Sequence, residues 1–154
     1  MSETQVAALD HTVQQTNAWL KALAEDHRLG DRPHAYSALR AVLHALRDRL
    51  TIEQAAHLGA QLPLLVRGIY FAGWRPAGQP DLWRRLDEFE ARIARELPRG
   101  FPVDAGTAAR AVFAVIWREI DFNETAKVVS DLPAPLRELW PPEARDLAEA
   151  RAAE

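Results

Sequence analysis

The 154-residue chain contains no cysteine, which excludes disulfides, thiolate metal sites and a cysteine nucleophile. It has no basic excess either: its formal net charge is -3, whereas nucleic-acid-binding modules usually carry surplus positive charge. The first residues, MSETQVAALDHTVQQ, lack the charged and then apolar layout of a signal peptide. Arginine heavily outnumbers lysine, as is typical of high-GC bacterial genomes. We therefore expect a bacterial, cytoplasmic protein that does not bind nucleic acid.

No apolar run is long enough to cross a membrane. The most apolar stretch, AQLPLLVRGIYFAGW (60–74), is shorter than the roughly 20 residues that a membrane helix needs, and Arg67 interrupts it. Four of its apolar residues have the i, i+4, i+7, i+8 spacing of one helix face and do not alternate as in a strand; they are Leu62, Val66, Ile69 and Tyr70. We expect a short helix here and no membrane contact.

The sequence repeats itself after 70 residues. Residues 34–70 align without a gap on residues 104–140. The identities at this offset include Ala38/Ala108, Arg40/Arg110, Ala41/Ala111, Val42/Val112, Ala56/Ala126, Leu62/Leu132, Pro63/Pro133 and Arg67/Arg137. The alanines count for less in an alanine-rich chain, but the whole match predicts an internal duplication.

Helix-start signals recur at matching positions. TIEQ (51–54) and DFNE (121–124) are typical of capping boxes, in which the first side chain accepts from the backbone and the last reaches back. Each predicts a helix of about ten residues, with Ile52 facing inward in the first copy and Phe122 in the second. Pro63 and Pro133 suit the first turn of a following short helix, where a missing amide hydrogen costs little. Apolar stripes predict longer helices over roughly 34–49, 81–98 and 104–119, and Leu82 begins the inward-facing stripe of the second.

Together these signals predict an all-α protein of two quasi-equivalent four-helix repeats, each long-long-short-short, packed into one compact helical domain. The expected boundaries are an N-terminal tail at 1–9, a first repeat at 10–72, a connector at 73–80, a second repeat at 81–141 and a polar C-terminal tail at 142–154. Glycines and prolines prevent the connector from continuing a helix. The tail is expected to be either a short polar helix or a frayed segment.

The segment ALRAVLHALRDRLTIEQAAHLGAQLPLLVRGIYFAGWRP resembles the signature of the bacterial domain of unknown function 2267 family. AQLP followed by an arginine and GW is the most specific part of this resemblance, which covers roughly residues 10–141. It implies a small all-helical cytoplasmic protein and supplies no catalytic residues. The second copy departs from the pattern, because SDLP stands where the first copy has AQLP.

Few residues carry recognisable chemistry. His44 with Asp48, and Glu53 with His57, have i,i+4 spacing and could each offer two metal ligands, but neither an HExxH motif nor the Glu-x-x-His pairs of di-iron bundles occur. No serine lies in a GxSxG elbow, and there is no glycine-rich phosphate loop. We expect no metal and no other cofactor. The sequence favours a non-enzymatic protein, although catalytic groups can be assembled from distant positions.

Repeated charges suggest two ion pairs. Arg40 and Arg110 recur amid apolar neighbours, and Asp26 and Glu96 are also equivalent across the offset. We predict that Arg40 pairs with Asp26 and that Arg110 pairs with Glu96; the alternative is two functional arginines that face one ligand. The arginines of segment 81–98 are interleaved with acidic residues, so we interpret them as a solvated face rather than an anion-binding surface.

Arg67, Trp74 and Arg75 are the candidate partner-binding residues. Arg67 lies at the edge of the apolar face of the short helix, the two others follow in the connector, and Arg and Trp are enriched at interface hot spots. The structural alternative is that Trp74 covers the core and Arg67 tethers the connector. We expect a non-enzymatic interaction or regulatory module that binds a protein partner or a second copy of itself. The alternative is a small-ligand- or metal-dependent enzyme with a pocket between the two repeats.

Overall fold

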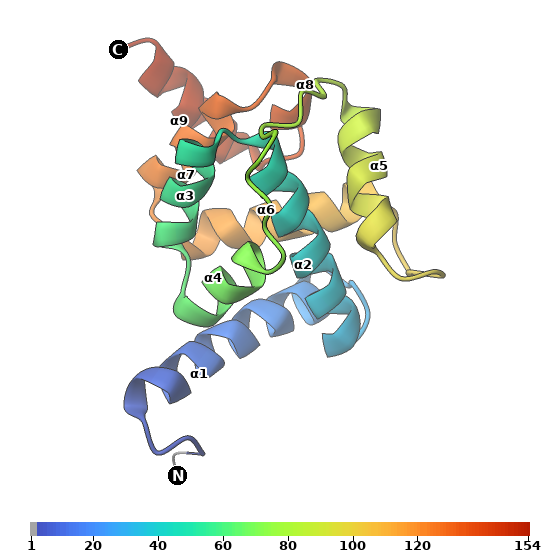
Figure 1. The fold of residues 1–154 in the computed structure, drawn as a ribbon, viewed down its shortest axis with the longest axis vertical. Coiled ribbons are helices and arrows are strands. Elements are labelled where there is room, and N and C mark those ends of the chain that lie inside the picture. Colours follow the sequence, from blue (N-terminus) through green and yellow to red (C-terminus); the bar gives the residue numbers. More distant parts are fainter. Residues whose placement is uncertain (1–2) are drawn as a thin grey trace.

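Helices make up the protein in the computed structural model, which describes residues 3–154 and contains no strand within them. In chain order they are α1 (Ala7–Lys21), a π-helical turn (Ala22–Asp26), α2 (Arg32–Arg49), α3 (Ile52–Gln61), α4 (Leu64–Phe71), α5 (Leu86–Glu96), α6 (Ala105–Glu119), α7 (Phe122–Asp131), α8 (Ala134–Arg137) and α9 (Pro142–Ala152) (Figure 1). The all-α prediction is confirmed. Within the described range, no helix combines the length and the apolar character needed to cross a bilayer.

Helix α2 forms the centre of the molecule. All residues from 41 to 47 are buried, because α1, α4, α5 and α6 pack around this helix. Figure 1 shows α2 between α1 at one end of the molecule and α5 at its side. A helix that is buried on all faces belongs to the core, so any charged group on it needs partners within the protein.

Several helices recur at the 70-residue offset. Both ends of α7 lie 70 residues after the ends of α3, and α8 begins 70 residues after α4. Arg67 donates to the carbonyl oxygen of Leu62 at 3.0 Å, and Arg137 donates to the equivalent carbonyl of Leu132 at 2.8 Å. These equivalences do not conflict with the duplication, which stays a prediction.

The predicted helix over 81–98 is shorter than expected, since α5 begins only at Leu86. The preceding residues are held in another conformation by the end of α2: Arg49 donates to the carbonyl of Trp83 at 2.7 Å, and the Asp81 amide donates to the carbonyl of Asp48 at 2.8 Å. Leu82, predicted to face inward, is therefore 78% exposed.

The C-terminal half differs from prediction in two further details. The predicted short helix over 133–140 is reduced to α8, and turn bonds follow it up to Trp140, where the next residue, Pro141, disfavours helical backbone. The C-terminal tail contains a full helix, α9, which packs against α7 and buries Ala144 and Ala148. Of the two alternatives for the tail, the helix is confirmed.

Helices α3 and α7 each begin with an apolar residue that faces solvent, contrary to prediction. Ile52 and Phe122 were expected inside, but they are 48% and 53% exposed. Each is the first residue of its helix, and the buried positions come later, at Leu58 and Val129 among others. Phe122 instead stacks on Trp117, with ring centroids 4.3 Å apart.

Candidate functional site

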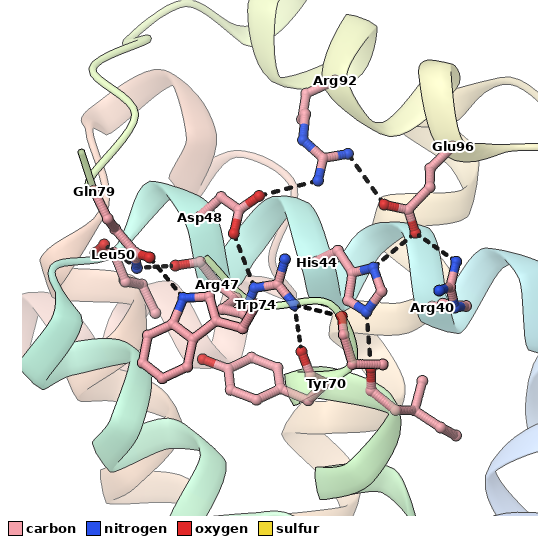
Figure 2. Close-up of polar contacts among 12 residues, drawn as sticks. Arg40, His44, Arg47, Asp48, Leu50, Tyr70, Trp74, Gln79, Arg92 and Glu96 are labelled. Carbon is pink, nitrogen blue, oxygen red and sulfur yellow. Dashed lines mark hydrogen bonds and ion pairs between the residues drawn. The ribbon is translucent and has the colours of Figure 1, made fainter. Parts of the chain in front are cut away.

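Charged side chains gather where α2 faces α5 and the end of α4 (Figure 2). The members of this ionic cluster are Arg40, His44, Arg47 and Asp48 from α2, and Arg92 and Glu96 from α5. Their spacing explains the gathering, because residues three or four apart in sequence lie on one face of a helix. The ionic cluster joins helices that belong to different predicted repeats.

His44 is the most deeply buried member of the ionic cluster, with 3% of its surface exposed. Its Nδ1 lies 2.8 Å from Oε2 of Glu96, and its Nε2 lies 2.8 Å from the carbonyl oxygen of Ile69. A carbonyl oxygen can only accept, so Nε2 carries a hydrogen. Burial lowers the pKa of His44, while the carbonyl of Ile69 and the carboxylate of Glu96 act in the opposite direction.

Arg47 fixes the end of α4 to α2. It is 4% exposed and donates to the carbonyls of Tyr70 at 2.8 Å and Ala72 at 3.2 Å, while its Nε donates to Asp48 at 2.8 Å. The last carbonyls of a helix lack partners within that helix, and a cation there is favourable to the helix dipole. Arg47 thereby sets where the chain leaves α4 and enters the connector.

Arg92 ties α5 to the same face of α2. Its guanidinium lies 3.0 Å from Asp48 and 3.3 Å from Glu96. Arg40 makes a longer contact to Glu96, at 3.4 Å, and its side chain is 42% exposed. Both carboxylates of the ionic cluster are thus engaged by more than one cationic or imidazole group.

The connector is anchored beside the ionic cluster by Trp74 and Gln79. The Trp74 indole donates to Oε1 of Gln79 at 2.7 Å, and the Gln79 amide donates to the carbonyls of Arg47 and Leu50, each at 2.7 Å. The Trp74 ring is half-buried, with its centroid 5.2 Å from that of Phe71. Trp74 therefore covers part of the core, as the structural alternative for this residue supposed.

An open cavity of about 300 Å³ lies over the ionic cluster. Its lining consists of Arg40, His44, Arg47, Asp48, Ala72, Gly73, Arg75, Arg92 and Glu96. Four arginines face two carboxylates, so the lining carries a net charge of +2 when His44 is neutral. Arg75 is exposed and forms no hydrogen bond or ion pair with the described residues. We call this space the arginine cavity.

The predicted ion pairs have other partners in the structure. Arg40 contacts Glu96, whereas the carboxylate of Asp26 lies 3.8 Å from Arg118. Arg110 donates to the backbone carbonyl of Glu138 at 2.9 Å. The reason is that α5 packs directly on α2, so Glu96 reaches Arg40 across the two predicted repeats and is not left for Arg110.

The candidate contact residues are only partly brought together. Arg75 lines the arginine cavity and Trp74 precedes it in the connector, but Arg67 is not among the lining residues. The Arg67 guanidinium instead donates to the carbonyls of Ala60 and Leu62 at the turn between α3 and α4. It tethers that turn and does not tether the connector.

The histidine pairs considered as metal ligands are also separated. His44 contacts Glu96 instead of Asp48, and His57 contacts Glu124 at 2.6 Å instead of Glu53. Among residues 3–154, no group of three or more histidine and carboxylate side chains is arranged to hold a metal ion.

Sequence reasoning missed Arg47 and Gln79. A signal for Arg47 existed, because it stands four residues after Leu43 on the predicted apolar face of its helix. A charged residue in that register indicates a buried group that needs partners. No comparable local signal marks Gln79, whose side-chain amide donates to the carbonyls of Arg47 and Leu50, 32 and 29 residues earlier in the chain.

A comparison with protein families connects this site to a wider group. The family model described as "Uncharacterized conserved protein (DUF2267)" matches residues 16–139, a range that includes the ionic cluster and the connector. No curated protein matches the chain.

Proposed function

The chain belongs to the DUF2267 family of uncharacterized conserved proteins, and we propose that it is a non-enzymatic binding module that holds an oxyanion of its partner in the arginine cavity. The oxyanion is a carboxylate or a phosphate group. Guanidinium groups suit both, because their planar set of donors matches two oxygens at once.

This proposal rests on the excess of arginines over carboxylates in the lining of the arginine cavity. Asp48 and Glu96 are already shared among Arg40, His44, Arg47 and Arg92, so neither neutralises Arg75. The long contact and exposure of Arg40 leave most of its donors accessible. An anion entering the cavity therefore meets accessible guanidiniums at Arg40 and Arg75, with the buried charges behind them.

The same geometry supports binding over catalysis. Each ring nitrogen of His44 lies 2.8 Å from an oxygen of the protein itself, so neither nitrogen is directed at a molecule bound in the cavity. The two carboxylates are likewise occupied by guanidiniums. An enzyme that uses the pocket between the repeats is the alternative, and these occupied groups do not favour it.

Trp74 and Arg75 support a protein as the source of the oxyanion. Arg75 is exposed at the rim of the arginine cavity and Trp74 precedes it in the connector, and aromatic and arginine side chains are the types that dominate interface energies. An acidic side chain of a partner, seated in the cavity, would bring the rest of that partner over this rim.

Titration with sulfate and with acetate, followed by amide NMR, tests the proposal. Saturable shifts are expected at residues 72–75 and 92–96, and comparing the two ions separates tetrahedral from carboxylate recognition. Arg75→Ala should weaken binding, whereas Arg84→Ala, another exposed arginine outside the cavity lining, should not. Unaltered binding in a folded Arg40→Ala/Arg75→Ala double variant, or shifts spread evenly over surface arginines, would overturn it.

A further inference from the structure

We propose that His44 takes up a proton when the oxyanion binds, so that binding in the arginine cavity is coupled to pH. This inference rests on the proposed function and adds its regulation. It starts from the positions of the two ring nitrogens of His44, both of which face oxygen acceptors.

The contact between His44 and Glu96 requires one shared proton. Since Nε2 donates its hydrogen to the carbonyl of Ile69, Nδ1 of a neutral ring has only a lone pair to present to Glu96. Two acceptors 2.8 Å apart repel each other. The observed distance therefore describes either an imidazolium beside a carboxylate or an imidazole beside a carboxylic acid. Loss of the proton opens the contact.

Two arginines contact the Glu96 carboxylate beside His44. From α5, Arg92 contacts this carboxylate, and from α2, Arg40 contacts it as well. Both arginines have the Glu96 carboxylate as their partner, so we assign the shared proton to Nδ1 of the imidazole. The other charged groups that line the cavity around His44 are Arg47 and Asp48 from α2 and Arg75 from the connector.

A bound anion would change the balance at His44. In the free protein, burial is the largest effect and lowers the pKa of His44 below 6.5, with a further contribution from Arg47. Above that lowered pKa the imidazole is neutral, and Glu96 keeps Arg40 and Arg92 as partners. A negative charge in the cavity offsets these arginines and raises the pKa of His44. The protein therefore binds the anion more tightly when His44 is protonated, and His44 binds its proton more tightly when the anion is present.

The sign of the pH dependence follows from this linkage. Below the pKa of the free protein, His44 is protonated before the anion arrives, and affinity is highest. As pH rises through the pKa values of the free and bound protein, affinity falls. One proton is involved, so the dissociation constant increases by at most about tenfold per pH unit within this window.

NMR of the imidazole nitrogens tests the coupling, with sulfate as the probe because its charge is constant from about pH 5.5 to 8, the range in which histidines titrate. We expect His44 to titrate below its usual value in the free protein and at higher pH with sulfate, and the sulfate Kd to weaken as pH rises. Glu96→Gln should abolish this pH dependence, because a glutamine amide donates to a neutral Nδ1. His11→Asn, an exposed histidine on α1, should retain it.

The possible results separate the two proposals. Sulfate binding with one Kd across this pH range would overturn the proton coupling and leave the proposed function standing. Absence of saturable sulfate binding would overturn the proposed function, and the coupling with it. The titration of His44 without sulfate, in the wild type and in Glu96→Gln, would still decide whether the pair shares a proton. Should Glu96→Gln not fold, the wild-type titration with and without sulfate decides the coupling.

Discussion

Replacing Arg47 with methionine removes a buried cation and keeps the apolar length of its side chain. The carbonyls of Tyr70 and Ala72 lose a donor, and Asp48 loses one of its two guanidinium partners. No water can easily replace the donor to Tyr70, because this bond lies in the interior. The end of α4 should therefore be detached from α2.

The expected cost is about 3–5 kcal/mol of the free energy of unfolding, which is typical when one partner of a buried ionic contact is removed. The hydrogen bond to Tyr70 alone accounts for about 1.5–3 kcal/mol, since its donor is charged and its acceptor is buried. In the variant, Asp48 still contacts Arg92, so the loss of stability stays below that of leaving a buried carboxylate without any partner. For a domain stable by about 5–15 kcal/mol, this is a large fraction.

Urea unfolding followed by circular dichroism measures the effect, and thermal unfolding should show a decrease of about 2–4 °C in Tm for each kcal/mol. Arg40→Met is the matched control: it also removes an arginine from α2, but one that is 42% exposed with a single contact at 3.4 Å, so its cost should stay below about 1 kcal/mol. Equal stabilities of the two variants would refute the reasoning. Should Arg47→Met not fold, Arg47→Lys, which keeps the charge, should be folded but less stable than wild type.

Two further predictions concern local packing and capping, and the same unfolding measurements check both. Gly68→Ala should stabilise the protein by about 0.5–1 kcal/mol, because a Cβ in this turn of α4 meets nothing within 4 Å. Gly59→Ala should destabilise it by about 1–3 kcal/mol, because its Cβ would lie 2.6 Å from Cε2 of Phe71; equal effects of the two substitutions would contradict this packing. Thr51→Ala should cost about 1 kcal/mol, because Thr51 and Gln54 form a capping box at the start of α3, and a cost near zero would count against that box.

The local signals in the sequence were sufficient where the deciding contacts span only a few residues. The capping box of Thr51 and Gln54 predicted the start of α3, and the structure contains both of its hydrogen bonds. At the equivalent position of α7, Asp121 accepts from the Glu124 amide as predicted. The Glu124 carboxylate, however, contacts His57 of α3, so the predicted second box is only half formed.

Where local interactions of similar free energy competed, the packing of the helices determined which contact formed. Arg40 could reach a carboxylate before or after it in the chain, and the packing of α5 on α2 selected Glu96, 56 residues away. Residues 81–85 fit a helical stripe, yet their hydrogen bonds with the Arg49 side chain and the Asp48 carbonyl hold them outside α5. A cap or a helical pair contributes about 1 kcal/mol or less, so contacts that form only in the folded core outweigh it. The sequence alone therefore determined the helical class and the helix starts that caps mark, while the arginine cavity and the contact between His44 and Glu96 depend on how the helices pack.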